Sequence, residues 1–357
     1  MIAFFLVLVA VAIAAEIYTL RHSLDGISYD CRPSEVLVEP GQKVQLITTV
    51  TNRKRRMVPF LRLQELVPLS FQGDVILETE SITDARGSIN SAVYMMPRQR
   101  MTRRIEFSMP DRGRYLFLGA NLSGGDFMGL SERMKNFPLE REIVVLPKRL
   151  PADVAEDMMG GMMGDISVSR FIFEDPVLTV GFREYTGHEP LKMISWTQSA
   201  RTGELQVKNY DYTIEREVAV ILNVDTFAFG PFADMLKELC FSMARSVCEE
   251  LEDRKIAYSY LSNAACDLPK SDMTDVVNGL GPAHMGTIME SLGRAKRENG
   301  ITMEALLDIA ARRAESGMIC IYISPMPEDA EEALLAPIRA RTGSDIYTLI
   351  AKEVQPE

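Results

Sequence analysis

The sequence predicts a chain in three parts: an N-terminal transmembrane helix (residues 1–21), a β-sandwich domain (25–147) and an α/β domain with a mostly parallel sheet (216–357). Three observations support this prediction. The chain opens with an unbroken apolar run, continues with segments that alternate apolar and polar residues, and ends with apolar strands separated by amphipathic helices. Its 357 residues suffice for two soluble domains, each with its own core.

The composition excludes several classes of protein. With 46% hydrophobic and 25% charged residues, the chain is neither disordered nor a multi-span membrane protein. The formal net charge of -11 argues against nucleic acid as a partner, because phosphate binding needs a net basic surface. The cysteines form no CxxC motif and no Cys/His pair at zinc-ligand spacing, so we expect reduced core thiols. They are Cys31, Cys240, Cys248, Cys266 and Cys320.

The N-terminal segment has the length of a membrane span. Every residue from 2 to 15 is apolar, and the first basic residue is Arg21. As a helix, residues 2–20 extend about 28 Å, close to the ~30 Å hydrocarbon core of a bilayer. A cleaved signal peptide and a buried core helix are the alternatives, but no basic residue precedes the apolar run. We therefore expect a retained anchor.

The basic residues near this segment all follow it: Arg21, Arg32, Lys43 and the cluster Arg53-Lys54-Arg55-Arg56. The positive-inside rule then predicts a single pass through the inner membrane, with the soluble domains in the cytoplasm. The cluster joins two predicted strands, so it is either a solvated turn or a contact with anionic lipid near the anchor. Membrane lipid is thus one expected partner.

Residues 25–147 predict a β-sandwich similar to an immunoglobulin or fibronectin module. Alternating segments occur at 43–50 and 60–63, turn residues at 40–41, 111–113 and 123–126, and the last strand at 142–146 before Pro147. Residues 148–168 then lose all periodicity and contain a run of methionines and glycines, which predicts a linker. An adaptable Met-rich docking surface is the alternative.

The α/β domain begins with a nearly continuous apolar run at 218–224, typical of a strand buried on both faces. A helix is predicted over 231–254, where apolar residues recur at three- and four-residue spacing and Pro231 suits the first turn. Further strands are predicted at 256–261, 318–323 and 346–351, and helices near 286–297, 302–316 and 328–340. This alternation indicates a sheet covered by helices on both faces.

A distinctive stretch lies at 181–205, within a region at 169–215 between the two domains. It resembles the core motif of the bacterial family called domain of unknown function 58, whose pattern is Arg-x-Tyr, Gly-Asp with Pro, a basic residue, Ile-His-Trp and Ser/Thr-Ala-Arg. The matching residues are Arg183, Tyr185, Gly187, Pro190, Lys192, Ile194, Trp196, Ala200 and Arg201. His188 replaces the usual Asp, and Ser195 replaces the usual His.

Two further stretches resemble elements at the end of that family's β domain: Arg112-Gly113-Arg114-Tyr115 and Gly125-Asp126-Phe127-Met128-Gly129-Leu130. The resemblance implies that the C-terminal domain is similar to the von Willebrand factor A fold. It also implies a MoxR-type AAA+ ATPase as partner.

The motif residues themselves combine cations, carboxylates and the sole tryptophan. A structural brace is the favoured interpretation, in which a salt-bridged clasp surrounds a largely buried Trp196 and fixes this region to the α/β sheet. The alternative is a surface that grips a partner protein through Arg183, Trp196 and Arg201.

No site for chemistry emerges from the sequence, so we expect neither an enzyme nor a cofactor. A von Willebrand A metal site needs Asp-x-Ser-x-Ser after the first strand, but here Asp225 is followed by Phe227 and Phe229, which removes two oxygen ligands. We expect Asp225 to cap the loop and both rings to pack. Residues 281–287 resemble a phosphate-binding loop without its lysine, and we expect an ordinary loop before a helix that begins near residue 286.

The expected function is therefore a membrane-anchored, cytoplasm-facing scaffold or adaptor. The resemblance implies work with the ATPase in the assembly or maturation of other proteins. The alternative is an extracytoplasmic adhesion or binding protein of von Willebrand A type.

Overall fold

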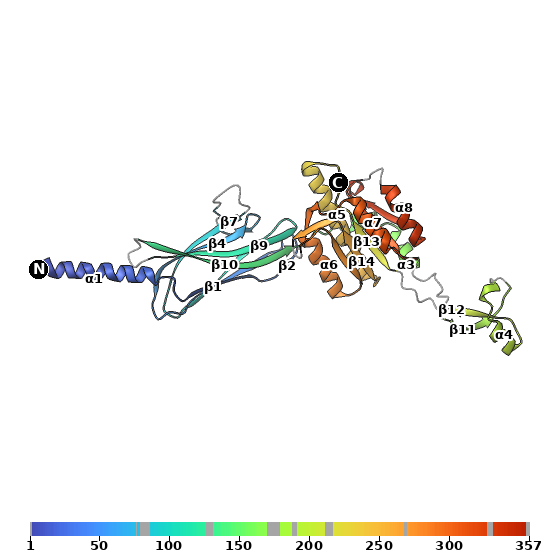
Figure 1. Ribbon diagram of the computed structural model, residues 1–357, viewed down its shortest axis with the longest axis horizontal. Coiled ribbons are helices and arrows are strands. Elements are labelled where there is room, and N and C mark those ends of the chain that lie inside the picture. Colours follow the sequence, from blue (N-terminus) through green and yellow to red (C-terminus); the bar gives the residue numbers. More distant parts are fainter. Residues whose placement is uncertain are drawn as a thin grey trace. The chain divides into compact units, whose positions relative to one another are not determined.

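The computed structural model describes residues 2–75, 77–78, 86–125, 131–169, 179–187, 191–210, 217–267, 270–326 and 331–354. It divides into two compact units (Figure 1). The first comprises Met1–Lys148 with Leu292–Ala295, and the second comprises Arg149–Ser291 with Lys296–Glu357.

The predicted N-terminal helix is present as α1, Ile2–Arg21. Its Phe4–Arg21 stretch is long and apolar enough to cross a membrane, and none of that stretch is buried within the protein. A helix that is apolar on all sides and uncovered by protein matches a hydrocarbon environment. Leu24, three residues beyond the helix, already belongs to the core of the first unit.

The rest of the first unit is a sandwich of two sheets. In the described residues, one sheet has the order β1-β3-β8-β5 and the other β2-β10-β9-β4-β7-β6. The strands are β1 Ile27–Pro33, β2 Leu37–Val38, β3 Val44–Asn52, β4 Val58–Pro68, β5 Gln72–Gly73, β6 Leu77–Glu78, β7 Arg86–Met95, β8 Arg100–Ser108, β9 Gly113–Gly125 and β10 Glu132–Val145.

Alternation along the strands forms the core between these sheets. In β3, Val44, Leu46, Thr48 and Val50 are buried, whereas the alternate residues at 45, 47 and 49 are more exposed. Val44 and Leu46 share an apolar cluster with Phe107 of one sheet and Phe117 of the other, so the predicted β-sandwich is confirmed. One predicted turn was wrong, because residues 123–125 continue β9 paired with β10.

The second unit contains a sheet with the order β17-β14-β13-β19-β20. Its strands are β13 Val218–Leu222, β14 Tyr258–Ser262, β17 Thr274–Gly279, β19 Ile319–Ser324 and β20 Ile346–Ile350. β13 pairs in parallel with both β14 and β19, β20 extends the parallel set, and β17 closes one edge in the antiparallel direction. A mostly parallel sheet was predicted and is observed.

Helices pack against this sheet (Figure 1): α5 Gly230–Asp253, α6 Pro282–Arg294, α7 Met303–Arg313 and α8 Glu331–Thr342. Ile221 of β13 shares one apolar cluster with Leu306 of α7 and Ile338 of α8. The neighbouring residues of β13 point to the opposite face, where α5 contacts β13 and β19. This arrangement explains why every residue of β19 is buried.

Two predicted boundaries near α6 were wrong. The helix begins at Pro282 rather than near residue 286, since proline suits a first helical position. It ends at Arg294, and the chain continues as β18, Ala295–Asn299. β18 joins a small sheet with β15 Ala264–Asp267 and β16 Lys270–Ser271, and a short 3-10 turn, η2 Ala351–Glu353, follows β20.

The prediction of a linker over 148–168 was also wrong. These residues form two short helices, α2 Ala152–Met159 and α3 Met162–Ser169, separated by Gly160 in a positive-φ conformation. Met159, Met162 and Met163 are buried, so the methionines fill a core instead of forming an open docking surface. Burial of these flexible apolar side chains stabilises helices too short to persist alone.

Candidate functional site

The carboxyl ends of three parallel strands meet at one edge of the α/β sheet. β13 ends at Leu222, between β14 and β19. The chain leaves β13 toward β14 and later returns to β19 on the other side, so strand order changes direction beside β13. Ligand sites of open α/β sheets lie in the crevice at such a point. The residues that follow the strands are therefore the first candidates for function.

Two buried asparagines close this edge with neutral hydrogen bonds. Asn263 donates from Nδ2 to Asn223 Oδ1 at 2.7 Å, and its own Oδ1 accepts from Val224 N at 2.8 Å. Asn223 Oδ1 also accepts from Asp225 N at 2.9 Å. Both asparagines have no exposed surface. The amides thus satisfy backbone groups of the loop and of each other.

Asp225 fastens this loop to the start of α7. Its Oδ2 accepts from Met303 N at 3.4 Å, and Thr302 completes the cap because its hydroxyl accepts from Ala305 N at 3.4 Å. A carboxylate at a helix N-terminus is favourable toward the helix dipole. Asp225 therefore caps the start of α7, whereas its own loop, which it was expected to cap, is held by Asn223. Within the described ranges, no group of three or more His, Cys, Asp or Glu side chains is placed to hold a metal ion.

The two phenylalanines at the lost serine positions are exposed. Phe227 is 80% exposed and Phe229 is 89% exposed, so the prediction that both rings pack was wrong. Gly230, at φ +70°, and Pro231 start α5 immediately, which leaves the short loop outside the helix–sheet interface. Phe232 and Met235 are also exposed at the start of α5. We call Phe227, Phe229, Phe232 and Met235 the aromatic edge.

The family-like motif folds as a small hairpin that holds a helix. β11 Thr179–Glu184 pairs antiparallel with β12 Gln206–Tyr210, and between them lie a 3-10 turn, η1 Leu191–Met193, and α4 Trp196–Thr202. Ile194 and Val207 pair across this hairpin and are both buried. Ser199 bridges helix and strand, since its hydroxyl donates to Ser195 O and accepts from Gln206 N, each at 2.8 Å.

The motif side chains lie mainly on the surface of this hairpin. Arg183, Lys192 and Arg201 are exposed, and Tyr185 is half-buried. Gly187 has φ +94°, a left-handed conformation that favours glycine. Trp196 is 66% exposed, so the expected burial of its ring was wrong. It occupies the first position of a helix with no buried residue. Pro190, His188 and Glu189 lie outside the described residues.

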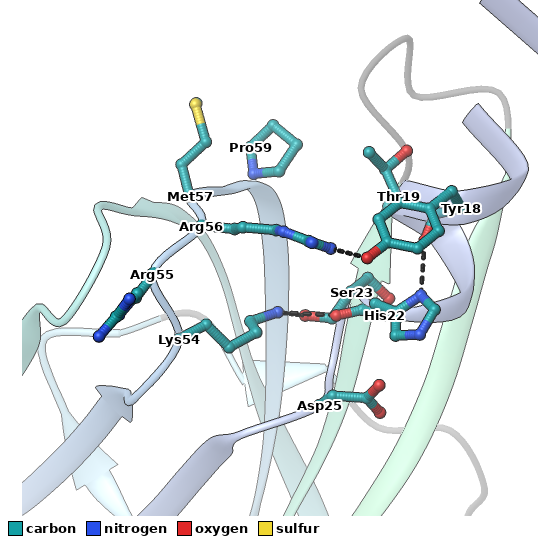
Figure 2. A pocket seen from close by; sticks show the side chains of 11 residues that line it. Tyr18, Thr19, His22, Ser23, Asp25, Lys54, Arg55, Arg56, Met57 and Pro59 are labelled. Carbon is teal, nitrogen blue, oxygen red and sulfur yellow. Dashed lines mark hydrogen bonds between the residues drawn. The ribbon is translucent and has the colours of Figure 1, made fainter. Parts of the chain in front are cut away.

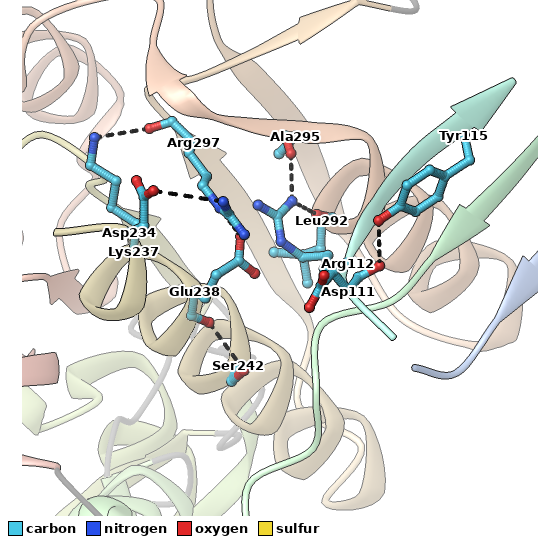
Figure 3. A network of polar contacts seen from close by, with 10 residues as sticks. All are labelled: Asp111, Arg112, Tyr115, Asp234, Lys237, Glu238, Ser242, Leu292, Ala295 and Arg297. Carbon is cyan, nitrogen blue, oxygen red and sulfur yellow. Dashed lines mark hydrogen bonds and ion pairs between the residues drawn. The ribbon is translucent and has the colours of Figure 1, made fainter. Parts of the chain in front are cut away.

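The family-like stretch at residues 112–115 has a structural role within the first unit. Arg112 is buried and donates to the carbonyl oxygens of Leu292, at 2.8 Å, and Ala295 (Figure 3). Glu142 accepts from Arg114 Nε and Arg294 Nη2, both at 2.7 Å. Burial raises the pKa of Glu142, but the two guanidinium groups outweigh burial and hold it below its usual value. Of the third motif stretch, only Gly125 is described.

A separate cluster fixes β18 to α5 within the second unit. Arg297 donates from Nε to Glu238 Oε1 at 2.8 Å, and its carbonyl oxygen accepts from Lys237 Nζ at 3.0 Å (Figure 3). Arg297 is thus paired with a carboxylate and Lys237 with a backbone carbonyl group. We therefore assign these contacts a structural role.

The segment 281–287 does not form a phosphate-binding loop. It lies mostly within the first turns of α6, and His284 packs edge-on against Tyr258 with ring centroids 4.8 Å apart. The cysteines are all free and buried, as expected. Burial raises the pKa of Cys320 to about 12 and raises those of Cys240 and Cys248 as well, which leaves them poor nucleophiles.

No family model and no curated protein matches the chain. Solved structures resemble parts of it at low TM-scores. A CARDB domain from Pyrococcus furiosus, in complex with di-metal ions, has 11% identity over 33% of this chain and 89% of its own, with a TM-score of 0.22. A non-cellulosomal cohesin from Archaeoglobus fulgidus has 11% identity over 33% and 91%, with a TM-score of 0.23. The sporulation control protein Spo0M from Bacillus subtilis has 13% identity over 45% and 58%, with a TM-score of 0.22. Likenesses of this size assign no function.

Proposed function

We propose that this protein is a membrane-anchored, cytoplasm-facing scaffold or adaptor whose aromatic edge binds a partner protein. The observation that carries this proposal is the near-complete exposure of Phe227 and Phe229 beyond the carboxyl end of β13, beside the point where the strand order changes direction. Burial of exposed aromatic rings against a partner is favourable, because it removes apolar surface from water.

The expected energy of this contact is substantial. Complete burial of a phenylalanine side chain contributes about 1.5–3 kcal/mol, and aromatic residues are enriched among the few that dominate binding. The network of Asn223, Asn263 and Asp225 fixes the backbone from which the loop with the two rings begins. A fixed backbone reduces the conformational entropy that the loop loses on binding.

We further propose that the two domains are immunoglobulin-like and von Willebrand factor A-like. The order β17-β14-β13-β19-β20, with the first strand of the domain in the centre and an antiparallel strand at one edge, supports the second assignment. We propose binding instead of catalysis, because the cysteine thiols are buried and the polar groups at the strand ends already hold the loop.

An extracytoplasmic adhesion protein is the alternative function. Such a protein would use oxygen ligands to hold a cation such as Mg²⁺ at this edge. Two observations oppose the adhesion protein and favour the adaptor. Exposed phenylalanines stand where a von Willebrand A metal site needs serines, and the carboxylate of Asp225 already caps α7. In addition, the basic residues of the first unit follow α1 in the sequence, which favours a cytoplasmic location.

The resemblance of the motif residues suggests a MoxR-type AAA+ ATPase as the partner. The full-length protein, extracted in mild detergent, should co-purify with this ATPase in at least one nucleotide state. The double variant F227S/F229S should weaken the association at least tenfold, equal to about 1.4 kcal/mol, because two rings lose their apolar contact.

Val277→Ser is the matched control. Val277 is also apolar and 77% exposed on the same domain, but it lies on the edge strand β17. This variant should bind the ATPase like the wild type. Equal binding by F227S/F229S would remove the aromatic edge from the proposal, and no ATPase in either nucleotide state would remove this partner.

A further inference from the structure

A basic loop is fastened to the end of the N-terminal helix. Residues 53–57 connect β3 to β4 and lie beside the last turn of α1 (Figure 2). Lys54 Nζ donates to the carbonyl oxygens of His22, at 2.8 Å, and Ser23. Arg56 donates to the hydroxyl of Tyr18 and lies over its ring, 4.6 Å from the centroid. Carbonyl groups at a helix end lack intrahelical partners, so Lys54 satisfies groups that would otherwise need water.

This loop and the helix enclose a cavity of about 390 Å³. The ring of Tyr18, Met57 and Pro59 supply apolar walls, and Lys54, Arg55 and Arg56 are the cations among the lining residues. Figure 2 shows Lys54 and Arg56 reaching toward α1, whereas the side chain of Arg55 extends away from the helix. Asp25 is the one carboxylate among the lining residues. A site with apolar walls and a net positive charge suits an amphipathic anion better than a bare ion.

One cation of the lining is available to a ligand. Arg55 is exposed and forms no ion pair with another described residue. Lys54 is partly buried, and this burial lowers its pKa, although Asp25 opposes the change. An added anion would compensate the desolvated ammonium group. The positive charge of the lining residues is therefore only partly balanced by the described protein groups.

The depth of the cavity matches that of lipid headgroups. The stretch Phe4–Arg21 contains 18 residues and is about 27 Å long as a helix, close to the ~30 Å hydrocarbon core of a bilayer. Tyr18 and Arg21 then lie at the interface, where aromatic and basic residues anchor membrane helices. A lipid beside α1 would carry its phosphate to the level of Arg55 and its acyl chains along the apolar helix.

We propose that this cavity binds the phosphate-bearing headgroup of an anionic glycerophospholipid from the leaflet that faces the soluble domains. The exposed side chain of Arg55 turns toward the cavity to contact the phosphate, and Lys54 and Arg56 are positioning residues that hold the loop against α1. The proposal rests on the membrane anchoring of the proposed function. A free phosphate offers the same charge, but the site lies where the apolar helix ends, so the membrane is the source.

Full-length protein in neutral detergent should retain phosphatidylglycerol more tightly than phosphatidylcholine, as measured by native mass spectrometry of the lipid-bound fraction. R55Q should weaken phosphatidylglycerol binding roughly fivefold, because one interfacial cation contributes about 1 kcal/mol. Arg55→Lys should restore it, since the charge returns.

R53Q is the matched control, because Arg53 is an exposed cation of the same loop that does not line the cavity. It should change the affinity less than twofold. An equal loss in R53Q and R55Q would overturn the site in favour of diffuse attraction to the surface. Displacement of the lipid by millimolar inorganic phosphate would overturn the membrane source.

Carbonate extraction of membranes separates failure of the anchor from failure of the site. A chain released by carbonate would contradict both proposals. A chain that resists extraction but shows no preference for phosphatidylglycerol would overturn the lipid site alone.

Discussion

An ion pair between a buried carboxylate and a partly exposed guanidinium joins the two sheets of the β-sandwich. Glu65 of β4 is 1% exposed and pairs with Arg103 of β8, so the bridge joins the two sheets. Its carboxylate also accepts from the hydroxyls of Tyr29, at 3.1 Å, and Thr48. Burial raises the pKa of Tyr29, so the phenol keeps its proton and stays a donor. A charge buried at this depth depends on every one of these partners.

Removal of Arg103 should therefore destabilise the sandwich strongly. R103M should lower the free energy of unfolding by roughly 3 kcal/mol, because Glu65 would remain buried without its cation. Hydrogen exchange of peptides from β4 and β8, in detergent-solubilised full-length protein, measures this loss.

Its sequence neighbour Arg104 provides the control. Arg104 is exposed on the same strand, and R104M should change the stability by less than about 0.5 kcal/mol. Equal exchange rates in the two variants would contradict a structural role for the buried pair.

The prediction for Asp225 gave the right kind of contact and the wrong partner. It was expected to cap its own loop, but its carboxylate accepts from the backbone of α7. The predictions for Phe227, Phe229 and Trp196 were wrong, because these residues were expected to pack and are exposed. Hydrophobicity favours burial on average, but the covering elements decide it for each ring, and a single sequence does not reveal them.

At the scale of elements, length and periodicity decided which predictions succeeded. α5 was predicted within one residue at each end, because its apolar stripe repeats over many turns and Pro231 marks its start. The eight-residue helices α2 and α3 were predicted as linker, since two turns contain too few positions to establish a period. Their burial, a tertiary effect, stabilises them.

The small helix α4 presents Trp196 to solvent, and this exposure favours partner binding over the structural brace. W196S should leave the thermal unfolding of the full chain unchanged within about 0.5 kcal/mol, because the ring contributes little to a core. The same variant should weaken co-purification of the ATPase about tenfold, as expected for an aromatic hot spot.

Tyr94→Ser serves as the control for this experiment. Tyr94 is 67% exposed, nearly the same fraction as Trp196, but lies on β7 of the sandwich. It should affect neither quantity. Loss of folding in W196S with no separate loss of binding would restore the brace interpretation.

For the whole molecule, the sequence predicted the order of parts from their distinct hydrophobic patterns. The first part of this unit ends at Lys148, one residue beyond the predicted end of the sandwich, but Leu292–Ala295 joins the unit from far along the chain. Arg112 explains this return, because its guanidinium group binds carbonyl oxygens of that segment. No local pattern in residues 292–295 signals such a contact.

The proposed membrane anchor makes the position of the soluble domains the central question about the whole molecule. α1 precedes the basic loop, and Lys54 and Arg56 fasten that loop to the helix end. If α1 spans the bilayer, the first unit and its cations lie on the same side. The positive-inside rule predicts that this side is the cytoplasm.

Reporter fusions at the C-terminus test this claim most directly. In bacterial cells, alkaline phosphatase, which needs disulfides formed outside the cytoplasm, should be inactive when fused after Glu357, whereas a green fluorescent protein at the same position should fluoresce. Both fusions should remain in the membrane fraction. An active phosphatase with a dark fluorescent fusion would contradict the adaptor and favour the extracytoplasmic adhesion protein.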